Sequence, residues 1–337
     1  MIEVKNLVKR YGNQLALADL SFTVENGKVY GLLGANGAGK STTMNIITGY
    51  IGATSGTVEI DGLDILKNPE MVKSKIGYLP EQPPLYLDMK VEEYLSFCGE
   101  LKKIPHNKRL QRMEEVIDKV QLGDVRQRLI KNLSKGYKQR VGLAQAIMGY
   151  PEVIILDEPT VGLDPQQIIE IRSLIRELAE EHTIIFSSHI LAEVQEVCDE
   201  FLIMAKGKLV VKETTDNIGS LMNAPLSIEL TIKTTPALAE KILAELPQIE
   251  RADYQAENET TKIHLQMKDQ TDIREELFLA FAKEQIAILE IQQSTTSLED
   301  VFLELIQDPV EAVEELTGET ATDLETAENK DEAGDAK

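Results

Sequence analysis

The 337-residue sequence lacks a long hydrophobic run, a closely spaced pair of cysteines and an excess of basic charge. Its longest apolar segments, such as residues 153–156 and 201–205, are far shorter than the ~20 residues that a membrane-spanning helix needs. The first residues also lack the basic region and apolar stretch of a secretion signal. We therefore expect a chain that does not cross a bilayer by itself and that stays in the cytoplasm.

The charge and the cysteines exclude further classes of protein. The net charge of −22 argues against nucleic-acid binding, which depends on neutralising phosphates. Cys98 and Cys198 do not form a Cys-x-x-Cys motif, and we expect two buried thiols in a reducing compartment. Residues 308–337 hold eleven acidic residues, two lysines and no aromatic residue. Because such a segment buries too little apolar surface to offset its ordering entropy, we expect a disordered acidic tail.

The pattern of apolar residues predicts two domains, as the length also suggests. The first, residues 1–215, begins with alternating, strand-like residues and continues with short buried strands separated by helices. Between about 86 and 150 the periodicity is helical only. These features predict an α/β fold with a largely parallel sheet, an N-terminal antiparallel β-subdomain and an inserted helical subdomain. The expected buried strands are residues 29–33, 153–156, 183–186 and 201–204.

The second expected domain, residues 216–307, has a different order of elements. Apolar residues alternate at 228–232, then repeat every fourth position after Pro236, and further strands and a helix follow up to about residue 291. The order β-α-β-β-α-β predicts a ferredoxin-like α+β domain. A last helix is expected at 298–306, before the tail.

A phosphate-binding loop is predicted at residues 34–41, which read Gly-Ala-Asn-Gly-Ala-Gly-Lys-Ser between an expected strand and an expected helix. Glycines let backbone N–H groups converge on phosphates, and the helix directs its positive end toward them. We expect Lys40 to reach the β- and γ-phosphates of a bound nucleotide and Ser41 to bind Mg²⁺. The expected nucleotide contacts are Gly34, Ala35, Asn36, Gly37, Ala38, Gly39, Lys40, Ser41 and Thr42.

Two acids, Asp157 and Glu158, end the strand at 153–156. In proteins with a phosphate loop, an acid at such a strand end holds the Mg²⁺ shell, which assigns Asp157 to the metal. The neighbouring carboxylate can accept a proton from an attacking water. Without the phosphate loop, these acids alone would be weak support for a nucleotide site.

Three further motifs lie at two predicted helix starts and at the end of a predicted strand. Ser134 is a candidate N-cap for a helix whose N-terminus can receive an anion, and Asp164 before Pro165 predicts another helix start. His189 follows a buried strand, at the sheet edge where doubly wound sheets bind ligands. The remaining histidines lack such a setting and are expected at the surface; they are His106, His182 and His264.

In this order, the motifs resemble the nucleotide-binding domain of an ATP-binding-cassette (ABC) transporter over about residues 1–215. The resemblance implies that Tyr11 stacks on adenine, that Glu158 is the catalytic base and that His189 senses the γ-phosphate. It also implies a head-to-tail pair of cassettes, formed with a second copy or a paralogous ATPase. In that pair, Ser134 and Gly136 of one chain cap the γ-phosphate bound by the other.

Two motifs depart from the family pattern. The signature loop usually reads Leu-Ser-Gly-Gly-Gln, whereas residues 133–137 read Leu-Ser-Lys-Gly-Tyr and keep the serine and the second glycine. The coupling loop usually has glutamine directly after its proline, whereas Pro80 is followed by Glu81 and Gln82. We favour Gln82 as the residue near Mg²⁺, because a carboxylate beside the γ-phosphate is repelled unless a cation lies between them. Glu81 stays the alternative.

The variant loops and the C-terminal module resemble bacterial exporters whose ATPase and permease are separate chains. We therefore expect an ATP- and Mg²⁺-dependent ATPase that works at the inner face of the cell membrane with a permease and without nucleic acid. A small-molecule kinase would have no use for the Ser134 helix start, and Glu158 argues against a module that only binds ATP. A soluble cassette ATPase regulating a non-transport machine would usually carry two cassettes or a long coiled coil.

Overall fold

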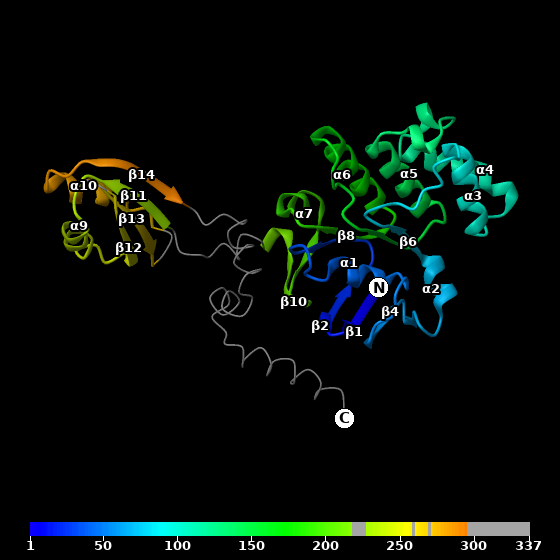
Figure 1. Ribbon diagram of the computed structural model, residues 1–337, viewed down its shortest axis with the longest axis horizontal. Coiled ribbons are helices and arrows are strands. Elements are labelled where there is room, and N and C mark those ends of the chain that lie inside the picture. Colours follow the sequence, from blue (N-terminus) through cyan, green and yellow to red (C-terminus); the bar gives the residue numbers. More distant parts are fainter. Residues whose placement is uncertain (218–226, 258–259, 269–270, 295–337) are drawn as a thin grey trace, which may run out of the picture. The chain divides into compact units, whose positions relative to one another are not determined.

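The computed structural model describes residues 1–217, 227–257, 260–268 and 271–294. The chain divides into two compact units, the first ending at Asp216 and the second beginning at Asn217 (Figure 1). Within the described ranges, no helix combines the length and the apolar character needed to span a membrane. The helix expected at 298–306 and the acidic tail at 308–337 lie outside the described residues.

Two sheets build the first unit. The N-terminal sheet is antiparallel, in the order β2-β1-β4-β5. The second sheet has the order β10-β9-β3-β8-β7-β6 and is parallel except for β10. The bounds of these strands are β1 (Ile2–Tyr11), β2 (Gln14–Val24), β3 (Val29–Leu33), β4 (Ser55–Ile60), β5 (Leu63–Asp64), β6 (Ile76–Leu79), β7 (Val153–Leu156), β8 (Thr183–Ser188), β9 (Glu200–Ala205) and β10 (Lys208–Thr214).

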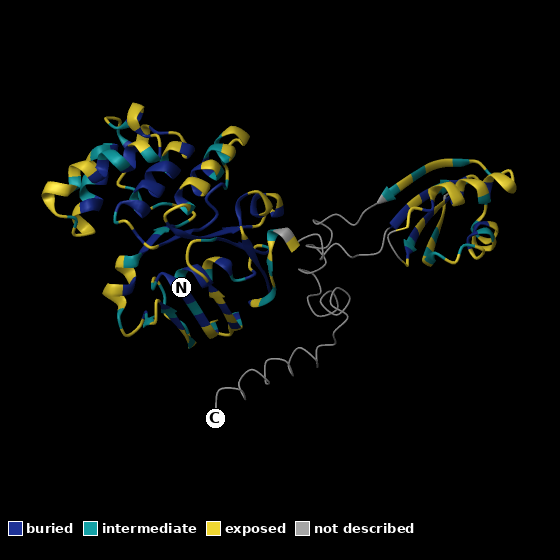
Figure 2. Ribbon diagram, turned by 180° about the vertical axis from the view of Figure 1, so that it is seen from behind, coloured by how far each residue is buried: buried dark blue, intermediate teal, exposed yellow. Residues whose placement is uncertain are grey.

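Helix α1 (Lys40–Ile47) lies between the two sheets, and α5 (Lys135–Ile147), α6 (Pro165–Ala179) and α7 (Leu191–Val197) lie on the other face of the parallel sheet (Figure 1). Met44 and Ile47 of α1 join a core that both sheets share. Because helices cover one face and α1 with the N-terminal sheet covers the other, strands β3, β7, β8 and β9 are buried on both sides, as Figure 2 shows.

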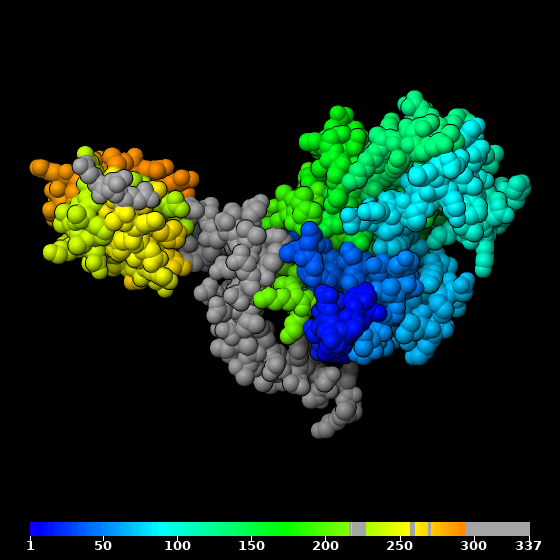
Figure 3. Space-filling view, in the orientation of Figure 1, coloured from blue at the N-terminus to red at the C-terminus, as the bar shows by residue number. Residues whose placement is uncertain are grey.

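The segment 86–150 is helical, as expected. It contains α3 (Val91–Leu101), α4 (His106–Lys119) and α5, with short 3₁₀ turns at Gly123–Val125 and Ile130–Asn132. Figure 3 shows this segment, in cyan to green, and the N-terminal sheet, in blue, on one face of the first unit. Helix α2 (Pro69–Lys75), which has proline in its first position, was not predicted from the sequence. A 3₁₀ turn, Thr215–Asn217, ends the described part of this region.

Within its described residues, the second unit contains six elements in the order β-α-β-β-α-β, and its sheet is antiparallel throughout in the order β12-β13-β11-β14. One face carries the core, in which Leu230, Leu265 and Phe281 are fully buried or nearly so. The elements are β11 (Ser227–Ile232), α9 (Pro236–Leu243), β12 (Ile249–Glu257), β13 (Thr260–Met267), α10 (Arg274–Lys283) and β14 (Ile288–Ser294).

Candidate functional site

The phosphate loop connects the wholly buried strand β3 to helix α1. Gly37 and Gly39 have φ angles of +87° and +109°, which side chains disfavour, so the sequence needs glycine at both positions. The N–H of Ala38 donates to the carbonyl of Ala35 at 3.1 Å, which folds the loop onto itself. Gly39 is the N-cap of α1 and provides no side-chain hydrogen bond. The N–H groups of the first turn of α1 therefore have no capping side chain.

Lys40, the first residue of α1, is 5% exposed and turns back onto its own loop. Its ammonium group donates to the carbonyl of Gly34 at 2.7 Å and to that of Ala35 at 3.3 Å. It also lies 3.4 Å from Oε1 of Glu158. Two carbonyls and a carboxylate therefore compensate a cation that would otherwise be buried at high cost.

Asp157 joins three elements at the end of β7. The hydroxyl of Ser41 donates to Oδ1 of Asp157 at 3.1 Å, and the hydroxyl of Ser187 donates to the same oxygen at 2.7 Å. Ser187 also accepts the N–H of Glu158 at 2.9 Å. Burial raises the pKa of Asp157 above its ordinary value, although both hydroxyl donors oppose the rise. Its ionised form is thus disfavoured in the protein unless a cation is bound beside it.

This shift predicts a stability gain for Asp157→Asn without nucleotide. The amide oxygen still accepts from both serines, whereas the unfavourable buried charge is removed. Thermal unfolding should shift upward at neutral pH, by about 2–4 °C for each ~1 kcal/mol relieved. The gain in stability should be complete above the raised pKa of Asp157. It should disappear as the pH falls through the ordinary carboxyl value, because Asp157 is then neutral in both the folded and the unfolded wild-type protein.

The matched control is Asp164→Asn, because Asp164 caps α6 by accepting the N–H of Gln167 at 2.9 Å, and asparagine caps as well as aspartate. This variant should unfold at the wild-type temperature. An Asp157→Asn protein less stable than wild type at pH 7 would contradict the burial argument.

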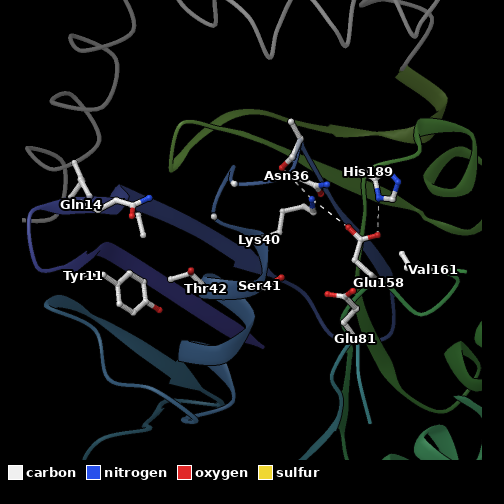
Figure 4. A pocket seen from close by; sticks show the side chains of 15 residues that line it. Tyr11, Gln14, Asn36, Lys40, Ser41, Thr42, Glu81, Glu158, Val161 and His189 are labelled. Atoms are coloured by element: carbon white, nitrogen blue, oxygen red, sulfur yellow. Dashed lines mark hydrogen bonds and ion pairs between the residues drawn. The ribbon is translucent and has the colours of Figure 1, made fainter. Parts of the chain in front are cut away.

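Glu158 lies between a lysine and a histidine. Its Oε2 is 2.9 Å from Nδ1 of His189, while Oε1 faces Lys40. Figure 4 shows both side chains converging on this carboxylate, with Glu81 below it and Tyr11 at the far end. Glu158 has a left-handed φ of +48°, which is unfavourable for a residue other than glycine. The backbone after β7 thus holds this carboxylate at the carboxyl ends of the parallel strands.

A pocket of about 450 Å³ beside the loop, here called the loop pocket, brings most of the expected residues together. Gly34, Ala38 and Asp157 are not among its lining residues, and Asp157 is buried with 4% exposure. The lining residues are Tyr11, Gln14, Leu15, Ala16, Ala35, Asn36, Gly37, Gly39, Lys40, Ser41, Thr42, Glu81, Glu158, Val161 and His189.

The coupling-loop geometry runs against our preference for Gln82. Glu81 lines the loop pocket, whereas Gln82 lines a neighbouring pocket with Asn45 and Tyr78. Glu81 and Asp157 also line that neighbouring pocket, and residues 81 and 82 form a bend after β6. The pocket linings favour Glu81 for the loop pocket, and the choice between Glu81 and Gln82 stays a prediction.

Ser134 and Gly136 lie at the N-terminus of α5 and do not line the loop pocket of their own chain. The hydroxyl of Ser134 accepts the N–H of Tyr137 at 3.4 Å, which confirms the expected N-cap. Gly136 lies against Gln167, and a Cβ on this glycine would come within 2.5 Å of the amide oxygen. A larger residue here would therefore displace the amide end of the Gln167 side chain.

The structure corrects one expectation about the histidines and adds residues that the motifs did not indicate. His182 is 5% exposed, with Nδ1 2.7 Å from the carbonyl of Pro151, and burial lowers its pKa. The expectation that it lies at the surface was wrong, because it precedes a strand buried on both faces. Ser187 and Glu193 also have buried polar contacts near the loop pocket. A polar pair ending the apolar strand β8 was the only sequence signal for Ser187.

Known proteins share both the sequence and the fold. Residues 17–161 match the family described as ABC transporter. The bacitracin transport ATP-binding protein BcrA of Bacillus licheniformis is 35% identical over 309 residues, which cover 91% of this chain and 97% of that protein. The chain belongs to the ABC transporter ATP-binding proteins. Its expected P-loop α/β fold is thereby confirmed, as is an ATP-binding and ATP-hydrolysing function as the subunit of a transporter.

Further comparisons support the same assignment. The linearmycin resistance ATP-binding protein LnrL of Bacillus subtilis (strain 168) is 31% identical over 90% of this chain and 98% of its own length. A solved ATP-binding subunit of an ABC transporter superposes with a TM-score of 0.59 at 33% identity, covering 65% of this chain and 91% of that one. A dimeric bacterial ABC transporter cassette, at 25% identity, superposes equally well over 64% of this chain.

Proposed function

We propose that this ABC ATP-binding protein powers export through a separate membrane permease, by ATP-driven closure and reopening of a head-to-tail pair of cassettes. The division of the site carries this proposal. Lys40, Glu158 and His189 converge on one pocket, whereas Ser134 and Gly136 lie outside the pocket of their own chain. A second copy or a paralogous ATPase would supply this last pair. The test is whether ATP holds a Glu158→Gln chain as a dimer and a second substitution at Ser134 releases it.

Each group of the loop pocket has a distinct proposed role. The loop N–H groups and Lys40 bind the phosphates, exchanging the carbonyls of Gly34 and Ala35 for phosphate oxygens. Glu158 accepts a proton from the attacking water, and His189 holds the other side of its carboxylate through the 2.9 Å contact. Tyr11, half exposed at the pocket rim, stacks on adenine. Loss of the γ-phosphate removes the bridge between the cassettes and reopens them.

The oxygen-rich part of the site fits Mg²⁺. Ser41 and Asp157 present a hydroxyl and a carboxylate 3.1 Å apart, and these are the hard oxygen ligands that Mg²⁺ prefers. We propose that these two residues hold the ion, with Glu81 nearby at the pocket wall. Bound there, it neutralises charge on the phosphates. The raised pKa of Asp157 agrees with this role, because a buried carboxylate without a cation is disfavoured.

The same proposal includes the domain organisation and the cellular location of the protein. Residues 1–215 form the ATPase domain, 216–307 an accessory domain and 308–337 an acidic tail. When β11, β12, β13 and β14 are numbered 1 to 4, their order across the sheet is 4-1-3-2. This order supports a ferredoxin-like fold for that domain. The printed names of relatives that serve bacitracin transport and linearmycin resistance support export. We place the chain at the inner face of the cell membrane, against its permease.

Alanine at each coupling-loop position distinguishes Glu81 from Gln82. Because Glu81 faces the loop pocket and Gln82 does not, Glu81→Ala should raise the Mg²⁺ concentration needed for half-maximal ATPase activity. We expect a shift of about fivefold to tenfold, or about 1 kcal/mol, for Glu81→Ala and less than twofold for Gln82→Ala. Titration of the purified chain with Mg²⁺ at saturating ATP measures both. A shift for Gln82→Ala alone would restore our original preference.

A further inference from the structure

A buried carboxylate outside the loop pocket joins the two segments that carry Glu158 and His189. Glu193, in the first turn of α7, is 2% exposed. Its Oε2 accepts the hydroxyl of Thr160 at 3.0 Å and the hydroxyl of Ser188 at 2.6 Å. One oxygen thus binds a loop and a strand end that lie 28 residues apart in the sequence.

The other oxygen of Glu193 has no hydrogen-bond partner among the described residues. It lies 3.5 Å from the guanidinium of Arg172, whose buried Nε is also unpaired in the described chain. A half-satisfied buried ion pair contributes little stability, and apolar residues of similar size often replace such pairs without loss. Stability alone therefore does not account for a carboxylate at this position.

The contacts of Glu193 complete a ring around the proposed catalytic pair. Thr160 stands two residues after Glu158, and Ser188 directly precedes His189. Glu158 and His189 meet at 2.9 Å, so the ring runs from Glu158 through Thr160, Glu193 and Ser188 to His189 and back. We infer that Glu193 is a positioning residue for ATP hydrolysis, which fixes the general base and its histidine relative to each other. This inference rests on the proposed roles of Glu158 and His189.

Backbone geometry gives this ring a physical purpose. Glu158 has a φ of +48°, which is unfavourable, so contacts on both sides must hold it. On its N-terminal side, Ser187 accepts its N–H; on its C-terminal side, Thr160 is held by Glu193. The carbonyl of Thr160 also accepts the N–H of Leu163 at 3.2 Å, so Glu193 further connects the pair to the turn that begins α6.

Glu193→Ala and Glu193→Gln test the inference in the full-length protein. The alanine variant removes both hydroxyl contacts, and displacing a reacting group by ~1 Å can reduce turnover by 10². We expect kcat to fall between about tenfold and a hundredfold, with the Kd of a fluorescent ATP analogue changed less than about threefold. The glutamine variant keeps one acceptor oxygen and should lose less than alanine does. The control is Glu196→Gln, which alters the exposed partner of Arg172 and should keep kcat within about twofold.

A Glu158→Gln background separates positioning from general structural damage. Once the base is absent, its alignment no longer matters, so Glu193→Ala should change the single-turnover rate of this background by less than about threefold. An equal loss in both backgrounds, or a wild-type kcat for Glu193→Ala, would overturn the inference while leaving the base assignment intact. Near-normal turnover of Glu158→Gln by itself would overturn the proposed function instead.

Discussion

Glu158→Gln should lower ATP hydrolysis by about 10² to 10⁴, the range expected when a general base is lost, while ATP still binds. Glutamine keeps the shape of the side chain and can still contact Lys40 and His189, but it does not accept the proton of the attacking water. Steady-state hydrolysis of the purified variant and titration with a fluorescent ATP analogue measure the two effects. A variant with near-normal turnover would contradict Glu158 as the base.

The same variant should accumulate as a dimer, because unhydrolysed ATP remains between two cassettes. Size-exclusion chromatography with Mg²⁺ and ATP should show a shift from monomer to dimer. Adding Ser134→Arg should abolish the shift, since Ser134 lies at the exposed N-terminus of α5 and the larger cationic side chain obstructs the composite site. A trapped dimer that tolerates Ser134→Arg would refute the head-to-tail arrangement, even with the base correctly assigned.

Gly39→Ala should weaken ATP binding by at least about a hundredfold, equivalent to ~2.7 kcal/mol. A Cβ at this position would lie 2.7 Å from the side chain of Leu17 and 3.0 Å from the carbonyl of Ala16, both on β2. The φ of +109° adds backbone strain for any L-residue. The loop therefore has to move, and its N–H groups no longer converge on the phosphates.

Gly37→Ala is the matched control for this substitution. Its φ of +87° brings comparable strain, but no atom lies within 4 Å of the added Cβ. We expect a loss of about tenfold or less, so the difference between the variants measures the steric contribution of β2. Equal Kd values for the two variants would contradict that contribution, and thermal unfolding of each shows that the domain stays folded.

The elements that position the loop pocket were largely predictable from local sequence. The strand before the phosphate loop, helix α1 after it and the buried strand ending in Asp157 all occur where the pattern placed them. Each is marked by neighbours in the chain: glycines at positive φ, a run of apolar residues, or a capping residue such as Asp164. Helix α2 escaped prediction because only Val72 of its seven residues is buried, which leaves no apolar periodicity.

Contacts between segments that are distant in the chain could not be predicted from the sequence. Nothing near Glu193 indicates that Thr160 and Ser188 will bind one of its oxygens, since the three meet only once α7 packs against β3 and β8. Likewise, Glu81 and Gln82 are chemically plausible in either order, and only the direction of the chain after β6 decides which one faces the loop pocket. Electrostatic repulsion favours Gln82, whereas the lining of the loop pocket favours Glu81, and the two alanine variants decide between them.

The backward turn of Lys40 has a consequence for the end of each turnover. When products leave, the ammonium group does not have to remain as a bare charge in a dry cavity, because the carbonyls of Gly34 and Ala35 stand ready at 2.7 and 3.3 Å. Nucleotide exchange is therefore a replacement of one set of oxygen partners by another. This exchange keeps the electrostatic cost of product release small.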